Sequence, residues 1–332
     1  MKMRIALLGL VCLVLAGIEL TSSRIGQIGG LSTKYRVNAS GNLLWRAKHK
    51  SERIARQAGM FFLPPQKERG TGPSFKGPVG LQLYSFRDDF PKDIPGTLKR
   101  VREMGFTIVE LAGTYNLSPE QFRVELDKAG LKAKSMHASF ESLRDKPDRV
   151  MADAKVLGVE YVGCAWIPHE GTNFNEADVD KAATVFNAAG AKAKAAGFRF
   201  FYHTHGYEFR PNGSGNLFDL LMSKTDGNNV FVQMDVFWVQ HPGQDPVQLF
   251  EKYGKRIKLM HLKDIKKGLK GDTTGTAPDN SDVVLGTGQV EWPRLLAAAK
   301  KAGVAYYFIE DESSTAATQI PLTLQYLEQV KF

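Results

Sequence analysis

Two histidines and a glutamate stand close together in the segment FYHTHGYEF, which covers residues 201–209. Residues i and i+2 of a β-strand point to the same face, so His203 and His205 would project in one direction. Converging imidazoles can hold a metal ion, and a carboxylate such as Glu208 can add a ligand or carry a proton. The alternative is a polar strand end with two satisfied histidines. The choice depends on which other side chains reach the same place.

A short sequence pattern that recurs from about residue 79 predicts the helices and strands that position these side chains. Each copy is a helix ending in Lys or Arg and a small residue, then a glycine, then a run rich in β-branched and aromatic residues. A glycine directly after a helix favours the left-handed C-cap conformation, and the run that follows favours a strand. The six glycines are Gly105, Gly130, Gly158, Gly197, Gly254 and Gly303.

Helix start signals agree with this division of the chain. Residues 118–121 read as a capping box with proline at the first helical position, Asp245 precedes a proline before another helix, and residues 176–196 have high helix propensity. Two further strands are expected at 79–85 and 230–238.

Eight strands that alternate with helices over about 250 residues predict an α/β fold of the (β/α)8 TIM-barrel class. The domain would cover 77–332. An open doubly wound sheet is the alternative, but its first strand usually leads into a glycine-rich phosphate turn. The segment LQLYSFRDDFP, at residues 81–91, has no such turn.

Polar side chains gather at the predicted carboxyl ends of the strands, where barrel enzymes place their active sites. Strand parity agrees, because residues two and four positions before Asp235, Lys263 and Glu310 would share their face and fill the barrel. Cys164, by contrast, reads as a small core residue. The candidate residues are Gln82, Glu110, His137, Trp166, His203, His205, Asp235, His261, Lys263 and Glu310.

The segments GFTIVEL, YHTHGYEF, QMDVFW, HLKD, GTGQVEW and FIEDE resemble the xylose isomerase-like TIM-barrel family of sugar isomerases and epimerases. The resemblance covers about residues 79–332. In that family a divalent metal is held by a carboxylate on strand five, Asp on strand six, His on strand seven and Glu on strand eight. The last three positions correspond to Asp235, His261 and Glu310. The strand-five position falls on His203, where many relatives have Glu.

The resemblance implies one divalent metal ion, with Mn, Mg, Zn, Fe and Ni all left open by this mixed donor set. The ion would polarise a carbonyl beside the proton to be moved. Glu310, His205 and Glu208 are the expected proton carriers, with His203 in the metal shell. A small-molecule sugar would contact Gln82, Glu110, His137, Trp166 and Lys263.

Several functions remain open at this point. A sugar or keto-sugar isomerase or epimerase is the family expectation. A lyase or dehydratase acting on 3-keto-glycosides or related keto-sugars is the alternative, since elimination does not need matched glutamates on two faces of the substrate. A non-catalytic sugar-binding protein would share the polar rim. An endonuclease-IV-like DNA repair enzyme would need more ligands and a basic face.

The charge distribution argues against a nucleic-acid partner. Residues 1–76 contain 13 Lys and Arg against three Glu, a net charge of +10, so the rest carries −1 of the total of +9. Residues 1–23 read as a signal peptide and 24–76 as a basic linker or disordered arm that packs little against the barrel. We therefore expect an exported protein, periplasmic or extracellular, with no stable membrane span after cleavage. A misassigned start codon would give the same pattern, and a homo-oligomer is left open.

The segment 265–291 is long for a loop of a barrel. Loops of this length commonly act as lids or binding segments. Because it follows the seventh strand, we expect it to overhang the site.

Overall fold

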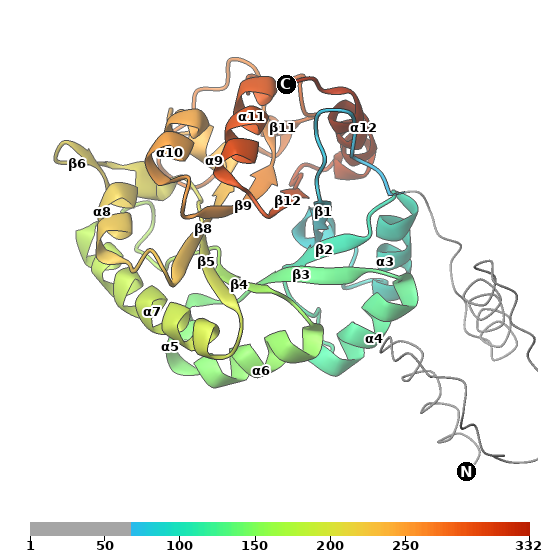
Figure 1. Ribbon diagram of the computed structural model, residues 1–332, viewed down its shortest axis with the longest axis horizontal. Coiled ribbons are helices and arrows are strands. Elements are labelled where there is room, and N and C mark those ends of the chain that lie inside the picture. Colours follow the sequence, from blue (N-terminus) through green and yellow to red (C-terminus); the bar gives the residue numbers. More distant parts are fainter. Residues whose placement is uncertain (1–67) are drawn as a thin grey trace, which may run out of the picture. The chain divides into compact units, whose positions relative to one another are not determined.

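The structure is a computed structural model and describes residues 68–332. In this part of the chain, eight parallel strands close into a barrel with the order β1-β12-β9-β8-β5-β4-β3-β2. Figure 1 shows these strands surrounded by helices. The predicted TIM barrel is therefore confirmed. The barrel strands are β1 (Val79–Gln82), β2 (Ile108–Leu111), β3 (Lys132–His137), β4 (Tyr161–Cys164), β5 (Arg199–His203), β8 (Val230–Asp235), β9 (Ile257–Leu262) and β12 (Tyr306–Ile309).

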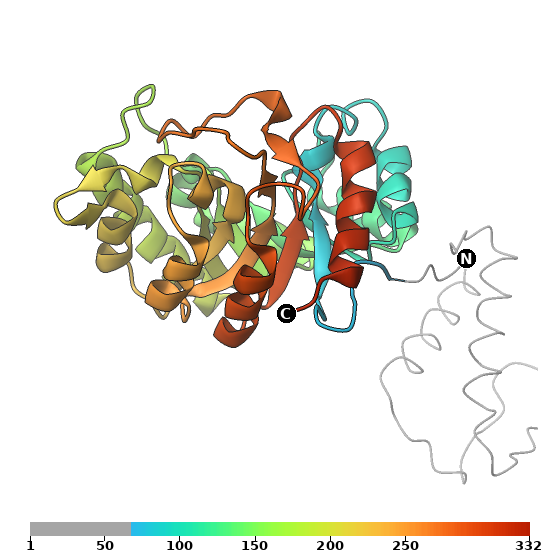
Figure 2. The same cartoon turned by 90° about the horizontal axis from the view of Figure 1, so that it is seen from above.

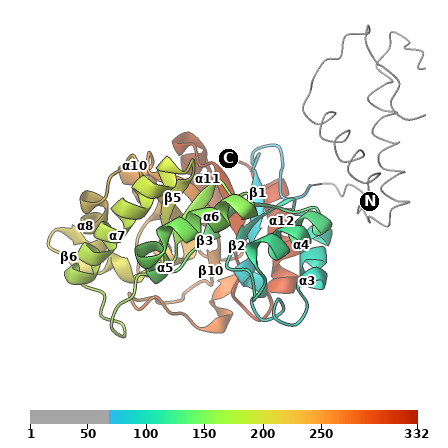
Figure 3. The same cartoon turned by 90° about the horizontal axis from the view of Figure 1, so that it is seen from below.

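Helices cover the outside of the barrel, and in Figure 3 α4, α6 and α7 lie across the strands. The three helix starts expected from the sequence are present, including the Ser118 capping box and the Asp245 N-cap. The helices are α3 (Ile94–Glu103), α4 (Pro119–Ala129), α5 (Phe140–Asp145), α6 (Pro147–Leu157), α7 (Glu176–Ala195), α8 (Leu217–Lys224), α9 (Val236–Gln240), α10 (Pro246–Tyr253), α11 (Trp292–Ala302) and α12 (Ala316–Gln329).

The interior of the barrel is filled by large side chains rather than by solvent. Tyr161, Phe201, Leu259 and Phe308 form one fully buried cluster, against which further aromatic groups pack. Phe201, Leu259 and Phe308 lie two residues before polar candidates on their strands, so the predicted parity is correct. Each of these strands therefore delivers a polar side chain at the place where it leaves the core.

Five of the six repeat glycines adopt the positive φ that a left-handed C-cap requires, and Gly254 does not. Its φ is −54°, in the right-handed region. Small size explains the residue here, because an added Cβ would lie 2.5 Å from the Phe250 carbonyl oxygen. The repeat thus locates all six helix ends but predicts the wrong conformation for one.

The segment 68–76 packs against the barrel, which corrects the expectation that the arm makes few contacts as far as residue 76. Arg69 Nε lies 3.0 Å from Glu328 Oε1 on α12. Phe75 is buried and makes an edge-to-face contact with Tyr307, at 5.0 Å between ring centroids. The expected signal peptide, and the linker as far as residue 67, lie outside the described residues. No helix within 68–332 combines the length and hydropathy needed to cross a bilayer.

The long segment after β9 is tied down at both ends. Short strands β10 (Asp264–Ile265) and β11 (Asp282–Val283) pair antiparallel at its base. The buried Asp264 carboxylate accepts hydrogen bonds from the backbone of Gly286 and Gly288 and from Trp292 Nε1. Figure 2 shows the orange segment between β9 and β11 arching over one end of the barrel. The remaining short elements are η1 (Leu83–Phe86), η2 (Tyr207–Phe209), η3 (Asp279–Ser281), β6 (Pro211–Asn212) and β7 (Gly215–Asn216).

Candidate active site

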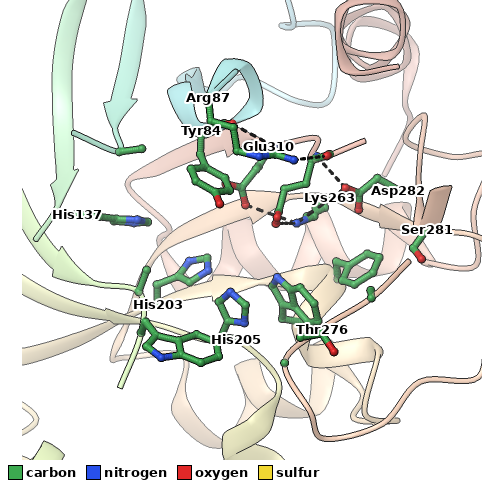
Figure 4. A pocket seen from close by; sticks show the side chains of 18 of the residues that line it. Tyr84, Arg87, His137, His203, His205, Lys263, Thr276, Ser281, Asp282 and Glu310 are labelled. Carbon is green, nitrogen blue, oxygen red and sulfur yellow. Dashed lines mark hydrogen bonds and ion pairs between the residues drawn. The ribbon is translucent and has the colours of Figure 1, made fainter. Parts of the chain in front are cut away.

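A pocket of about 770 Å³ opens at the carboxyl ends of the barrel strands. The segment after β9 contributes residues from Gly275 to Asp282 to its wall, so the expectation that this segment overhangs the site is confirmed. Figure 4 shows Thr276 and Ser281 of this segment on the side of the pocket opposite His137 and His203. The sequence-predicted residues that line the pocket are His137, Trp166, His203, His205, Lys263 and Glu310.

Asp235, His261 and Glu310 form a compact group that we call the metal cluster. Glu310 lines the pocket, while Asp235 and His261 are fully buried and contact Glu310 or each other behind the wall. One ligand atom from each lies within 4.8 Å of the other two. His261 Nδ1 is 3.0 Å from Glu310 Oε2 and 3.5 Å from Asp235 Oδ2. Asp235 uses Oδ1 to accept from the Trp238 backbone N–H, which leaves its buried Oδ2 with no hydrogen-bond partner. A buried carboxylate oxygen without a partner is costly unless a cation completes its surroundings, so this donor set fits a divalent metal.

A second polar group lies beneath the metal cluster, and we call it the polar floor: Gln82, Glu110, Ser135 and Gln233. All four side chains are fully buried. Glu110 accepts from Gln82 Nε2 and Gln233 Nε2, each at 2.7 Å, and from the Ser135 hydroxyl. Each side chain of the polar floor therefore has a hydrogen-bond partner within the protein.

The polar floor fixes the orientation of His261. Glu110 Oε1 lies 2.5 Å from His261 Nε2, while Nδ1 of the same ring faces Asp235 and Glu310. A proton held on Nε2 by Glu110 leaves Nδ1 as the donor atom for a metal, which is the usual carboxylate–histidine–metal arrangement. Without a metal, burial alone would lower the pKa of His261, but the carboxylates of Glu310 and Glu110 outweigh burial and hold that pKa well above its usual value.

The predicted substrate contacts of Glu110 and Gln82 are wrong. Neither residue lines the pocket, because each is fully buried under the histidines. Glu110 does contact His137, at 3.3 Å from its Nε2. Burial would raise the pKa of Glu110, yet His137 and His261 hold that pKa well below its usual value. A buried carboxylate that stays ionised can keep a hydrogen bond to an imidazole N–H.

Sequence reasoning gave no role in the site to Gln233 or Ser135, which complete the floor. The register of β2 and β3 shifts between Val109 and Glu110, and that of β8 and β9 shifts between Val232 and Gln233. In both pairs the extra residue lies in the partner strand, Lys134 in β3 and Lys258 in β9. The two shifts therefore set which residues face Glu110 and Gln233, and no residue type in the sequence marks either position.

His203 lies beside the metal cluster but within a different group. Its Nδ1 is 3.0 Å from Gln233 Oε1, which also contacts His137 Nε2 at 2.9 Å. His137, His203 and His261 form a second cluster with metal-ligand spacing. Burial, followed by the neighbouring His261 and His137, holds the pKa of His203 well below its usual value, so the ring is neutral. Since Nδ1 is engaged by Gln233, Nε2 is the nitrogen that His203 can offer to a metal.

Glu208 does not face the pocket, which corrects its assignment as a proton carrier. It lies in η2, is fully buried and is not part of the pocket wall. Its Oε1 accepts from the backbone N–H of His205 at 2.9 Å. Burial raises the pKa of Glu208 to about 7. Glu208 therefore lies behind the wall that His205 forms, and it cannot replace the missing strand-five carboxylate.

His205 itself is held by aromatic rings at the pocket wall. Its ring stacks on Trp238 at 4.6 Å between centroids and meets Trp166 edge-to-face at 5.0 Å. Its buried Nδ1 has no hydrogen-bond partner. Burial lowers the pKa of His205, which keeps the imidazole neutral and able to accept a proton.

Comparison with known proteins agrees with this architecture. Residues 98–330 match the family described as xylose isomerase-like TIM barrel. The chain belongs to the xylose isomerase-like TIM-barrel family. A curated inosose dehydratase of Clostridium botulinum is 36% identical over 98 residues, which are 28% of this chain and 31% of that protein. The chain thus aligns with about a third of the length of this relative.

Solved structures extend the match over the whole barrel. A sugar phosphate isomerase/epimerase from Parabacteroides distasonis is 25% identical, with a TM-score of 0.63, covering 76% of this chain and 98% of that one. The structure of the IOLI protein with a zinc atom has a TM-score of 0.59 at 15% identity, covering 75% of this chain and 95% of that one, and shows that the fold is shared. This chain carries a His/Asp/Glu cluster suited to a metal at the carboxyl ends of its barrel strands.

Proposed function

We propose that this protein is a divalent-metal-dependent enzyme that removes a proton next to the carbonyl of a sugar or keto-sugar. The observation that carries the proposal is the metal cluster, in which the buried Asp235 Oδ2 has no hydrogen-bond partner among residues 68–332. Asp235, His261 Nδ1 and Glu310 would hold the ion, with His203 Nε2 as the fourth donor. When bound, a divalent ion supplies Lewis-acid polarisation of the substrate carbonyl. The zinc in the IOLI protein structure supports metal binding by this fold, but the identity of the metal here is part of the test.

Glu310 is the proposed base. Burial would raise the pKa of Glu310, but Lys263 and His261 hold that pKa below its usual value, so the carboxylate is ionised and ready to accept a proton. Lys263 Nζ lies 3.7 Å from Glu310 Oε2. His205 is the second candidate for proton transfer, because its neutral ring forms part of the same pocket wall. Trp166 and Trp238 pack against this ring.

Dehydration is the reaction that the site supports best. Removal of the proton α to the carbonyl forms a carbon–carbon double bond as the β-hydroxyl leaves, and the hydroxyl takes up a proton to depart as water. Epimerisation instead needs a base on each face of the substrate, and here His203 stands where many relatives have the second glutamate. Similarity to inosose dehydratases supports this outcome. Isomerisation or epimerisation is the second candidate, supported by the similarity to the isomerase/epimerase structure over the whole barrel.

Product analysis tests the reaction. The purified protein is loaded with each of Mn, Mg, Zn, Fe and Ni, and is incubated in D2O with an inosose, a 3-keto-glycoside and a panel of aldoses and ketoses. Dehydration gives an enone that absorbs in the ultraviolet. Epimerisation or isomerisation gives a new isomer with deuterium at the exchanged carbon and no such absorption. Protein that takes up none of these metals would contradict the proposal.

Two variants test the assignment on β5. His203→Ala removes the fourth donor and should weaken metal binding, measured by calorimetry. Glu208→Gln lies behind the wall and should leave metal affinity unchanged. The reverse result would assign Glu208 to the metal and would require the segment 203–208 to move.

We also propose that the protein is exported by cleavage near residue 23, because residues 1–23 read as a signal peptide. N-terminal sequencing of the exported protein tests this. A sequence that begins at Met1 would contradict it.

A further inference from the structure

The charged side chains that line the pocket are unequally divided between the two signs. Arg87 and Lys263 are the only Lys or Arg residues among the described residues of the wall. Five carboxylates oppose them, and Asp235 lies directly beneath. The carboxylates of the wall are Glu141, Asp279, Asp282, Glu310 and Glu312.

Lys263 is already neutralised by carboxylates of the protein. Its ammonium forms an ion pair with Glu312 and lies 3.7 Å from Glu310 and 4.0 Å from Asp282. Its exposed fraction is only 2%, and it packs over the rings of Phe237 and Trp238. An anionic ligand would have to displace at least one of these carboxylates to reach the ammonium (Figure 4).

Arg87 is also engaged by the protein. Its Nη2 donates to the Glu312 carbonyl oxygen at 2.8 Å, and its Nη1 donates to the Tyr84 carbonyl oxygen at 3.3 Å. The guanidinium also lies over the Tyr84 ring, 4.8 Å from its centroid. An arginine commonly binds a phosphate by donating two parallel hydrogen bonds from its guanidinium group. Here both terminal nitrogens of Arg87 already donate to backbone carbonyl oxygens.

The remaining wall suits a polyhydroxylated ring. Tyr84 and Trp166 are 43% and 41% exposed, and both line the pocket. Exposed aromatic faces of this kind pack against apolar C–H surfaces, while carboxylates accept hydrogen bonds from hydroxyl groups. The volume of about 770 Å³ lies in the upper part of the range of about 300–1,000 Å³ for small-molecule sites.

We propose that the pocket selects uncharged carbohydrates over phosphorylated ones, and that Glu312 enforces this choice by occupying Lys263. The inference rests on the proposed carbohydrate substrate and specifies its class. A phosphate dianion would meet like charge from Glu312 and would find no free cationic side chain in the described wall. Selection of this kind works by repulsion of the wrong ligand as well as by attraction of the right one.

Calorimetry on metal-loaded protein tests the inference with D-glucose, D-glucose 6-phosphate and inorganic phosphate as probes. Wild type should bind glucose more tightly than glucose 6-phosphate. Glu312→Gln removes the carboxylate that forms the ion pair with Lys263 and should raise the affinity for both phosphate probes about 10-fold relative to the affinity for glucose, which corresponds to roughly 1.4 kcal/mol. Any direct contact of phosphate with the ion is common to both proteins and cancels in their comparison.

Glu251→Gln is the matched control, because Glu251 is exposed on α10 and does not line the pocket. It should change no affinity. A wild-type preference for glucose 6-phosphate, or a Glu312→Gln protein with unchanged phosphate affinity, overturns the inference. If wild type binds neither sugar, tighter binding of inorganic phosphate by Glu312→Gln supports the inference, and unchanged binding overturns it. If that variant does not fold, the wild-type preference decides alone. Loss of the proposed function is separate, since it would appear as absence of metal in elemental analysis while the preference between sugars persists.

Discussion

The polar floor and the metal cluster are joined by the hydrogen bond between Glu110 and His261. They differ in how many of their buried polar atoms have a hydrogen-bond partner within the protein. The floor side chains Gln82, Glu110, Ser135 and Gln233 all find partners within the protein. Around the pocket above them, several buried polar atoms have none. These atoms are Asp235 Oδ2, His205 Nδ1, Trp238 Nε1, Ser281 Oγ and Asp282 Oδ1.

The difference separates two kinds of buried polarity. A closed network stabilises one arrangement of side chains and gives nothing to a ligand. Buried groups without partners cost stability and persist where a ligand can complete them. We therefore expect the floor to position His261, and the metal cluster and the pocket wall to contact what binds.

The largest effect is expected from Asp235→Asn, which removes the unpartnered oxygen of the metal cluster. Metal affinity should fall by more than about 100-fold, because hydrogen-bond partners of metal ligands alone account for about 10–100-fold. Turnover should fall with it. Metal titration by calorimetry and product assays measure both. Asp127→Asn, an exposed carboxylate on α4, is the control and should change neither. Wild-type metal affinity in Asp235→Asn would show that the unpartnered oxygen is not a ligand atom.

Glu110→Gln tests the floor side of the comparison. The variant leaves the histidines above and the amides beside it without their carboxylate, and removal of one partner from a buried pair costs about 3–5 kcal/mol. Metal affinity should fall by about 10–100-fold through loss of orientation of His261. Chemical denaturation and metal titration provide the two measurements.

The Lys134–Glu160 pair on the outside of the barrel is the matched control for this variant. Its atoms are 2.6 Å apart, but the side chains are 24% and 48% exposed. Glu160→Gln should therefore cost only about 0–1 kcal/mol. If Glu110→Gln costs no more than Glu160→Gln, the floor is not a cooperative network.

The sequence predicts much of the barrel and part of the site, because the signals for these features lie in residues that are close together in the chain. The glycine after each helix and the parity of Phe201 with His203, or of Phe308 with Glu310, are written in neighbouring residues. The floor is not, because the residues that meet in it depend on the register between neighbouring barrel strands, and that register shifts at Lys134 of β3 and Lys258 of β9. The prediction of Glu208 as a proton carrier is wrong because its polarity suggests a place in the pocket, while the tight turn at Gly206, with φ of 97°, directs the side chain inward.

Glu208 differs from both the floor and the metal cluster. Its Oε2 has no hydrogen-bond partner, but the residue lies behind the pocket wall rather than in it. Protonation of Glu208, rather than binding of a ligand, can remove the cost of burying its charge. Its pKa is about 7 in the folded protein against 4.5 as a free side chain, so the unfolded chain releases the proton first as pH rises. Stability from this group is therefore lost between about pH 4.5 and pH 7, by at most about 3 kcal/mol.

Glu208→Gln should remove that part of the pH dependence, measured as the free energy of unfolding at pH 5 and pH 7.5 for the variant and wild type. Asp282 also titrates near pH 7, so only the difference between the two proteins is used. Glu170→Gln, an exposed residue, should leave the profile unchanged. A variant with the same slope as wild type would mean that Glu208 is ionised and stabilised in the folded state, like the carboxylate of the floor.

The smallest effect is expected at the outer wall, where Trp166 contributes surface rather than polar atoms. Its ring contacts His169 and His205 but remains 41% exposed, so its removal should cost little stability. An aromatic contact is worth about 0.5–1.5 kcal/mol, so Trp166→Ala should weaken sugar binding by about 2- to 13-fold. The expected signature is a raised KM with nearly unchanged kcat, because the ring holds substrate and transition state alike. Val124→Ala on α4 removes an equally exposed apolar side chain, 50% accessible, away from the pocket and should alter neither constant. A fall in kcat at constant KM would instead place Trp166 with His205 in the proton-transfer machinery.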